Sequence, residues 1–201
     1  MKILAVSCSP RKKGNTEILL GEALQGAKAE GAEIELYSVS GKNIQPCDGC
    51  WTCMKDGQCH IKDDMQELYD KLLAADGIIF GTPIYFYAMT AQAKTVMDRS
   101  MPLGHPDRNL ANKVGGVIAV AGSMGLSDAL KDWYFYIVSH RMLPASFVAG
   151  YGGAKGDVNK LEKGRQAARD LGRQMVKLVE KKFEYPPEFA SPPIAYGTHT
   201  F

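Results

Sequence analysis

Residues 2–27 read KILAVSCSPRKKGNTEILLGEALQGA, and the architecture of the whole chain follows from this stretch. Its first part, Lys2 to Val6, is a mostly apolar run without polar alternation, which is typical of a parallel strand buried on both faces. In its second half, Leu20, Ala23 and Ala27 share one face of a helix. A buried strand that leads directly into an amphipathic helix predicts the start of an α/β fold.

The same alternation continues along the chain. We expect further strands at residues 33–39, 77–81, 114–121 and 144–149, and further helices at 63–73, 88–101, 126–140 and 157–182. Five strands that alternate with five helices predict a doubly wound parallel sheet with right-handed crossovers. In such sheets ligands bind outside the carboxyl ends of the strands.

The composition of the chain is that of an ordinary globular protein. Its 201 residues are 45% hydrophobic and 23% charged, with a net charge of +2. This small charge argues against a nucleic-acid partner or a polybasic membrane patch. No apolar stretch approaches the roughly 18 residues that span a bilayer, so we expect a cytoplasmic protein with no membrane partner.

The segment between the first strand and the first helix, residues 7–16, reads SCSPRKKGNT. It contains neither the G-x-G-x-x-G nor the G-x-x-x-x-G-K-[ST] pattern, so the usual sequence signals of a dinucleotide-binding site and of a P-loop nucleoside triphosphatase are missing. Free backbone N–H groups at a helix start, several hydroxyls and Arg11 favour a bound dianion such as a phosphate monoester. The alternative is a capped helix start with a solvated Arg11.

Two further loops follow the third and fourth strands. Residues 82–87 read TPIYFY, and residues 121–125 read AGSMG. Tyr85 and Phe86 offer aromatic surface, while the small residues of the second loop allow a close approach of the backbone to a ligand. Either loop alone is a weak signal. Because the carboxyl ends of parallel strands share one edge, we expect both loops to meet the residues 7–16 there.

The most specific feature is the spacing Cys47-x2-Cys50-x2-Cys53-x5-Cys59. Cysteines two residues apart can place thiolates on several irons of a [4Fe–4S] cluster, and a fourth completes the set. The spacing matches poorly the two separated C-x2-C pairs of a structural zinc site, although zinc and unligated thiols remain alternatives. The fifth cysteine, Cys8, is expected to be a small buried residue.

These motifs together resemble the iron–sulfur flavoproteins, a family within the flavodoxin-like NADPH-dependent FMN reductases. The resemblance spans about residues 1–150 and rests on SPRKKGNT at 9–16, the four cysteines, IKDDM at 61–65, ADGIIFGTPIY at 75–85 and MDRS at 97–100. It implies a flavodoxin-like domain over residues 1–182 with strand order 2-1-3-4-5 and an iron–sulfur loop at 41–62. Residues 183–201 hold four of the ten prolines, so we expect an extended arm on the surface or on a neighbouring subunit there, with a disordered tail as the alternative.

The resemblance also implies two cofactors and their ligands. FMN would be held by Ser9, Arg11, Gly14, Asn15 and Thr16 at its phosphate and by Pro83, Ile84, Tyr85, Phe86, Ala121, Gly122 and Ser123 at its ring. A [4Fe–4S] cluster would be held by Cys47, Cys50, Cys53 and Cys59. It further implies a homodimer or homotetramer, with the cluster of one protomer near the flavin of another.

A function follows as an expectation from these cofactors. An FMN-dependent oxidoreductase would pass electrons between the cluster and FMN, from a ferredoxin-type donor to a small acceptor such as a quinone, O2 or peroxide. The alternative is an NAD(P)H-dependent FMN or quinone reductase whose cysteine loop is structural or zinc-bound; a plain electron carrier is a third reading. No catalytic side chain is predicted. The cysteine loop follows the second strand, so we expect it on the face of the flavin loops.

Overall fold

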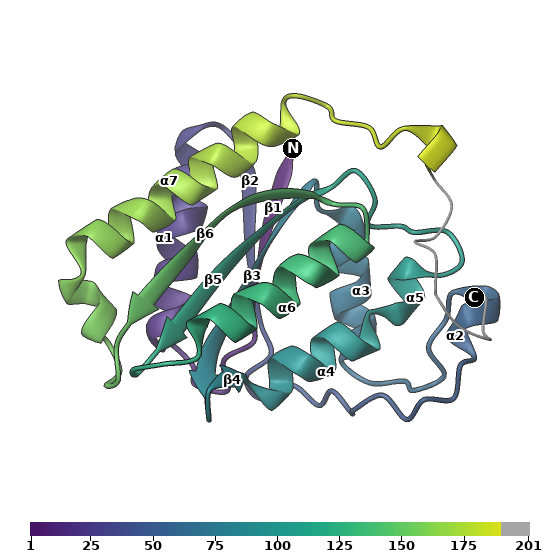
Figure 1. Ribbon diagram of the computed structural model, residues 1–201, viewed down its shortest axis with the longest axis horizontal. Helices are drawn as coiled ribbons and strands as arrows, with labels where there is room; N and C mark the ends of the chain where they lie inside the picture. The colour runs from purple at the N-terminus through teal and green to yellow at the C-terminus, as the bar shows by residue number, and fades with distance from the viewer. Residues whose placement is uncertain (190–201) are drawn as a thin grey trace.

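The computed structural model describes residues 1–189 and forms a sheet covered by helices on both faces (Figure 1). The strands are β1 (Lys2–Ser7), β2 (Glu33–Ser38), β3 (Gly77–Tyr85), β4 (Ala88–Met89), β5 (Val114–Ala121) and β6 (Leu143–Tyr151). The helices are α1 (Asn15–Ala29), α2 (Cys53–Asp56), α3 (Met65–Ala74), α4 (Ala91–Arg99), α5 (Met101–Gly104), α6 (Leu126–Ser139) and α7 (Glu162–Val179), with 3₁₀ turns at Asp157–Lys160 and Pro187–Phe189.

The strand order is β2-β1-β3-β5-β6, and all four pairings along this path are parallel. Counted along the chain without β4, this is the predicted order 2-1-3-4-5, and the flavodoxin-like fold class is confirmed. The sequence did not reveal β4, a two-residue strand antiparallel to the end of β3. Because β3 continues to Tyr85, the residues 82–85 that we predicted as a loop are the end of a strand, which is buried at Thr82 and exposed only at Tyr85.

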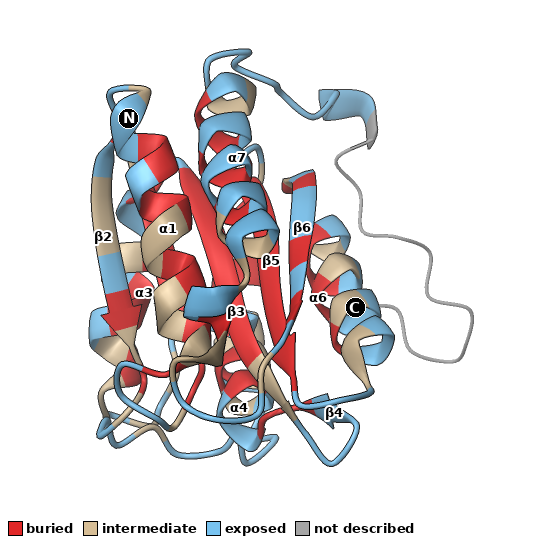
Figure 2. Ribbon diagram, turned by 90° about the vertical axis from the view of Figure 1, so that its left-hand side faces the viewer, coloured by how far each residue is buried: buried red, intermediate tan, exposed pale blue. Residues whose placement is uncertain are grey.

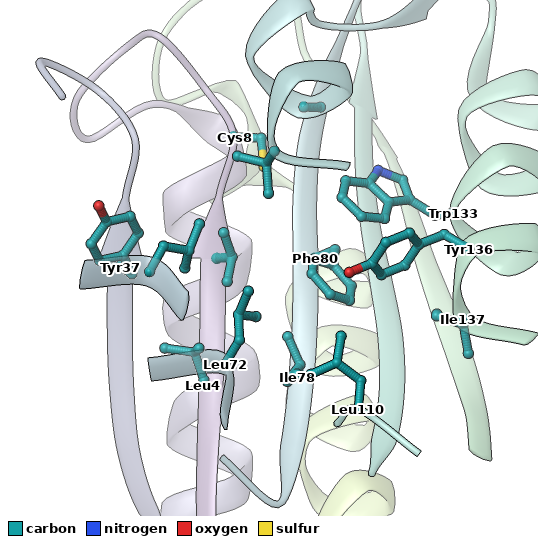
Figure 3. Close-up of a cluster of buried hydrophobic side chains, with 14 of the residues drawn as sticks. Leu4, Cys8, Tyr37, Leu72, Ile78, Phe80, Leu110, Trp133, Tyr136 and Ile137 are labelled. Atoms are coloured by element: carbon teal, nitrogen blue, oxygen red, sulfur yellow. The ribbon is translucent and has the colours of Figure 1, made fainter. Parts of the chain in front are cut away.

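The core consists of two apolar layers, one on each face of the sheet (Figure 2). Neighbouring residues of β1 alternate between them, since Leu4 contributes to one layer and Ile3 to the other, as the pleat of a strand requires. The first layer lies under α3, α4 and α6 and includes Phe80, which stacks on Trp133 with ring centroids 4.4 Å apart (Figure 3). The second lies under α1 and α7.

Helices α1 and α7 approach each other through glycines. A Cβ on Gly172 would lie 1.8 Å from the carbonyl oxygen of Ala23, and a Cβ on Gly26 would lie 2.0 Å from that of Arg169. No larger residue fits this contact without moving a backbone. The close approach holds α1, and with it the loop that precedes α1, against the rest of the fold.

Several predicted boundaries are wrong in detail. The helix expected at 88–101 begins only at Ala91, because the Thr90 side chain caps it by accepting a hydrogen bond from the N–H of Ala93. The helix expected at 157–182 is divided into a 3₁₀ turn and α7. The helix expected at 63–73 begins only at Met65, and Asp63 accepts the N–H of Met65 while its carboxylate mainly binds Arg99.

The predicted arm at 183–201 is described only as far as residue 189, so its Pro192 and Pro193 lie outside the described residues. Tyr185 is tied to the domain, since its N–H donates to Asn112 Oδ1 at 2.8 Å and its ring lies 5.3 Å from the Arg141 guanidinium carbon. Across residues 1–189, no helix combines the length and the apolar character that crossing a membrane requires.

Candidate functional site

The loop between β1 and α1 is held in a tight turn. The Ser9 hydroxyl accepts the N–H of Arg11 at 3.2 Å, and a Cβ on Gly14 would lie 3.2 Å from the carbonyl oxygen of Arg11. No side chain caps α1 at Gly14. The first backbone N–H groups of α1 therefore stay available as hydrogen-bond donors, and together with the helix dipole they favour an anion at this point.

Asn15 has a structural role that the sequence did not reveal. Its side-chain amide donates to the carbonyl oxygens of Gly152 at 3.1 Å and Ala154 at 2.8 Å, and it accepts the N–H of Gly156 at 2.8 Å. These bonds join the loop after β6 to the start of α1. The side chain of Asn15 is thus fully engaged with protein, and what it can offer a phosphate is its backbone N–H.

A cavity of about 180 Å³ lies where these loops meet, at the carboxyl edge of the sheet. Most of the residues predicted to hold FMN line it, namely Ser9, Arg11, Gly14, Asn15, Thr16, Pro83, Ile84, Tyr85 and Gly122. The structure adds Val120, Gly152, Gly153 and Lys155. Lys155 brings a second cation beside Arg11. Lys155 could not be predicted from the sequence, because it lies on a loop that long-range hydrogen bonds, including those of Asn15, bring to this place.

The remaining predicted ring residues lie beside the cavity but do not line it. Ala121 is buried in the sheet, and Ser123 is exposed at the start of its loop. Phe86 is 96% exposed and forms with Tyr87 the two-residue turn between β3 and β4. Both have positive φ, 46° and 68°, which is a strained backbone for aromatic residues.

This strained turn is supported from behind. Gly125 has φ +92°, and a Cβ there would lie 2.4 Å from the carbonyl oxygen of Tyr87. The turn therefore rests directly on the loop after β5. On its other side, the Arg11 guanidinium carbon lies 6.0 Å from the ring centre of Tyr85. The rim of the cavity thus consists of a fixed aromatic projection next to a cation.

Cys8 is a packing residue, as predicted. It is fully buried, and its backbone is fixed on both sides, since its N–H donates to the Gly81 carbonyl at 2.8 Å and its own carbonyl accepts the Thr90 hydroxyl at 2.9 Å. Burial raises the pKa of the Cys8 thiol to about 12. The thiol is therefore neutral and unreactive at ordinary pH.

The other four cysteines lie on the loop between β2 and α3. Cys47 and Cys50 are exposed, Cys53 and Cys59 are partly buried, and no cysteine in residues 1–189 forms a disulfide. The pKa of Cys53 is raised, first by burial and further by the negative charge that Cys59, Cys50 and Cys47 would carry. The four thiols are thus electrostatic neighbours, a donor set that fits an iron–sulfur cluster and would also accept zinc.

A short network orders the exposed part of this loop. Asp48 accepts the N–H of Cys50 at 3.2 Å and lies 2.7 Å from His60 Nε2. Ligand atoms of Asp48, Cys50 and His60 lie within 4.8 Å of one another, so Asp48 and His60 lie beside one of the four thiols. The role of His60 could not be predicted from the sequence, because nothing in the spacing placed it beside Asp48.

The position of the cysteine loop corrects one expectation. The loop begins at the carboxyl end of β2, but it then runs away from the flavin loops to α5, where a Cβ on Gly57 would lie 3.3 Å from the carbonyl oxygen of His105. In Figure 1, α2 lies beyond α5, on the far side of α4 from β4. No residue of the cysteine loop lines the 180 Å³ cavity, so the thiols and this cavity are separate sites within one chain.

A larger cavity of about 570 Å³ lies directly beside the thiols, between the cysteine loop and α4, α5 and α6. Cys47 and Cys53 line it, together with apolar side chains that include Trp51, Met101 and Phe135. His140 lines its inner end, and its Nδ1 is buried without a hydrogen-bond partner among the described residues. Burial, and after it the charges of His105 and Arg108, lower the pKa of His140 to about 4.

Comparison with known proteins places the chain in a family. Residues 1–154 match the family model of the NADPH-dependent FMN reductases. An iron–sulfur flavoprotein of Methanocaldococcus jannaschii is 40% identical over 194 residues, which is 90% of this chain and 100% of that protein. An iron–sulfur flavoprotein of Methanosarcina thermophila is 37% identical over 155 residues, covering 76% of this chain and 81% of its own length.

Among solved structures, a flavone reductase aligns with a TM-score of 0.73 at 24% identity, over 96% of this chain and 66% of that chain. At this identity the likeness concerns the fold. The family model and the relatives are those of flavin-binding proteins, which agrees with the cavity that the loops form at the carboxyl edge of the sheet. The chain therefore belongs to the NADPH-dependent FMN reductase family and, within it, to the iron–sulfur flavoproteins, and it is an FMN-binding, flavin-dependent oxidoreductase.

Proposed function

We propose that this oxidoreductase holds FMN in the 180 Å³ cavity and a [4Fe–4S] cluster on Cys47, Cys50, Cys53 and Cys59, and that it passes electrons between them. The observation that carries the proposal is the gathering of four thiols without disulfides on one loop of a chain in this family. The relatives named as iron–sulfur flavoproteins support the same assignment.

At the phosphate end, the residues of the β1–α1 loop would neutralise and orient the ligand. Arg11 and Lys155 supply two positive charges at the cavity. The hydroxyl groups of Ser9 and Thr16 supply hydrogen-bond donors on short side chains. The uncapped start of α1 adds backbone N–H groups. Together these groups suit a dianionic phosphate monoester better than a neutral ligand.

At the ring end, the chain would offer a surface rather than an acid or a base. Pro83, Ile84 and Tyr85 line the cavity from the end of β3, and Gly122 lines it from the loop after β5. A glycine at this position lets the backbone approach a planar ring closely. Tyr85 is 41% exposed, so its ring is accessible for stacking.

The two groups supply complementary chemistry when bound, because a [4Fe–4S] cluster exchanges single electrons whereas FMN accepts or donates one or two. We propose a ferredoxin-type protein as the donor and a small molecule such as a quinone, O2 or peroxide as the acceptor. The exposure of Cys50, which does not line the 570 Å³ cavity, supports electron entry from a protein partner, since it leaves this part of the loop open to a docking surface.

The separation of the two sites within one chain supports a homodimer or homotetramer. The apolar side chains near the 570 Å³ cavity are strongly exposed in the single chain: Trp51 by 57%, Phe135 by 76% and Val138 by 62%. An apolar patch of this kind is typical of a surface that a partner covers. In our proposal a second copy covers it and brings its flavin rim, with Tyr85 and Phe86, to the thiols.

The second candidate is an NAD(P)H-dependent FMN or quinone reductase whose cysteine loop is structural or holds zinc. The description of the matching family as NADPH-dependent favours it. Thiol sulfurs, with Asp48 and His60 beside Cys50, are also ligands that zinc accepts.

Anaerobic spectroscopy and kinetics separate the two candidates. The first predicts flavin bands together with a broad absorbance that dithionite bleaches, and reduction of the bound flavin by a reduced ferredoxin faster than by NADPH. Flavin bands alone, one zinc per chain and steady oxidation of NADPH without ferredoxin would establish the second candidate instead. Sedimentation at micromolar concentration tests the assembly, for which a monomer is the contradicting result.

A further inference from the structure

Arg99, at the end of α4, is a buried cation that the proposed electron transfer does not use. Its side chain is completely inaccessible to solvent, and that of its partner Asp63 is 3% exposed. Arg99 Nη1 donates to Asp63 Oδ2 at 2.7 Å, and Nη2 donates to Asp63 Oδ1 at 2.9 Å. The two parallel bonds form the bidentate arrangement that only arginine gives with a carboxylate.

The same two groups bind both ends of the cysteine loop. Arg99 Nη1 also donates to the carbonyl oxygen of Gln45 at 2.7 Å, and Nη2 donates to that of Ile61 at 3.3 Å. Asp63 Oδ2 in turn accepts the N–H of Gln45 at 2.8 Å. Gln45 lies two residues before Cys47, and Ile61 lies two residues after Cys59. The ion pair therefore closes the neck of the loop that carries all four thiols.

The Arg99 guanidinium also reaches the end of the loop that carries Cys59, because it donates to the carbonyl oxygen of Ile61, two residues after this cysteine. Burial lowers the pKa of Arg99, but the hydrogen bonds to Asp63 and the negative charges of neighbours that include Cys59 outweigh this effect and raise it. Tyr69 connects the two residues, since its hydroxyl donates to the Arg99 carbonyl and its ring lines a small cavity together with Cys59. The guanidinium charge thus acts on the Cys59 end of the cluster loop.

The hydrogen bonds account for four of the five N–H donors of the guanidinium. The fifth, on Nε, is buried and has no acceptor within residues 1–189. A buried pair of this kind is seldom retained for stability alone, because its desolvation offsets much of the attraction.

We propose that Arg99, held by Asp63, is a positioning residue for the iron–sulfur cluster: it closes the neck of the loop and raises the reduction potential of the cluster. This inference rests on the proposed assignment of the cluster to the four cysteines. The first effect follows from the hydrogen bonds to Gln45 and Ile61. The second follows because reduction adds a negative charge to the cluster, and a nearby positive charge in a weakly screened interior stabilises that reduced form.

Two substitutions separate the two effects. Arg99→Met removes both the charge and the donors, and it leaves the Asp63 carboxylate uncompensated near the cluster. Arg99→Lys keeps the charge but cannot make two parallel bonds to Asp63. Arg165→Met is the matched control, because Arg165 also bonds a carboxylate, Glu22 at 2.6 Å, but lies on α7 on the opposite face of the sheet.

The anaerobically purified full-length variants are compared by two readouts besides activity. The first is the rate of iron loss to an added chelator, and the second is the midpoint potential of the cluster, from a redox titration followed by electron paramagnetic resonance. We expect both Arg99 variants to lose iron faster, by about 10- to 100-fold in Arg99→Met. We expect a more negative potential in Arg99→Met, a potential near that of the wild type in Arg99→Lys, and no change in Arg165→Met.

The possible failures are distinguishable. A wild-type protein without iron and acid-labile sulfide would overturn the proposed function, and this inference with it. A wild type that holds the cluster, with Arg99 variants of unchanged chelation rate and potential, would overturn the inference alone. If Arg99→Met does not bind flavin and so is not folded, Arg99→Lys decides: iron loss at the wild-type rate contradicts the closing of the neck by Arg99.

Discussion

Replacing Arg11 and Lys155, the two cations that line the 180 Å³ cavity, tests the proposed flavin site at the level of single side chains. A hydrogen bond to a charged group contributes about 1.5 to 3 kcal/mol. Arg11 is exposed at the rim, where solvent screens it, so we take the lower end of this range. A loss of about 1.5 kcal/mol corresponds to a roughly tenfold higher Kd for FMN in Arg11→Ala. We expect a similar change in Lys155→Ala, and about hundredfold in the double variant if the two act independently.

The assay is titration of FMN into the flavin-free protein, followed by the quenching of flavin fluorescence. Lys13→Ala is the matched control, since Lys13 lies in the same loop but does not line the cavity. Riboflavin, which is FMN without its phosphate, is the matched ligand, and its Kd should change little in any variant. Unchanged FMN affinity in Arg11→Ala and Lys155→Ala, or an equal loss for riboflavin, would refute the assignment of these cations to the phosphate.

Three further predictions concern the cysteines, pH and the helix contact. Cys53→Ser should lose iron and sulfide but retain flavin, whereas Cys8→Ser should retain all three; full iron in the first variant would show that the ligands are misassigned. The pKa of His140 is about 6.5 in the unfolded chain and about 4 in the folded chain. Because protonation below pH 6.5 therefore favours the unfolded chain, the free energy of unfolding, measured with urea, should fall by about 2 kcal/mol between pH 7 and 5. His140→Gln should flatten this pH dependence. Gly172→Ala should lower stability by about 1 to 3 kcal/mol, because its Cβ would meet the Ala23 carbonyl, while Gly21→Ala, with nothing within 4 Å, should not lower the Tm.

The sequence was sufficient for the fold and for most of the lining of the 180 Å³ cavity, for a physical reason. A parallel strand buried on both faces leaves an apolar run such as Lys2 to Val6, and the carboxyl ends of such strands must meet at one edge. Ser9, Tyr85 and Gly122 could therefore be brought together without coordinates, although they lie far apart in the chain. The alternation of strands and helices can be recognised from local sequence patterns, and it determines which loops meet at this edge.

What the sequence could not give depends on long-range contacts with no local pattern. Lys155 lines the cavity on the loop after β6, which Asn15 binds from the start of α1. Asp63 could be read as a helix cap, but its pairing with Arg99 joins residues from two elements, and neither residue has a spacing that marks the pair. The path of the cysteine loop away from the flavin edge is likewise decided by packing against α5. These are the features that only the three-dimensional arrangement reveals.

The most direct test of the account is the content of iron, acid-labile sulfide, zinc and flavin per chain in the protein purified without oxygen. The account predicts about four iron, about four sulfide and one FMN per chain, with no stoichiometric zinc. One zinc per chain without sulfide, or a chain that binds no flavin, would contradict it.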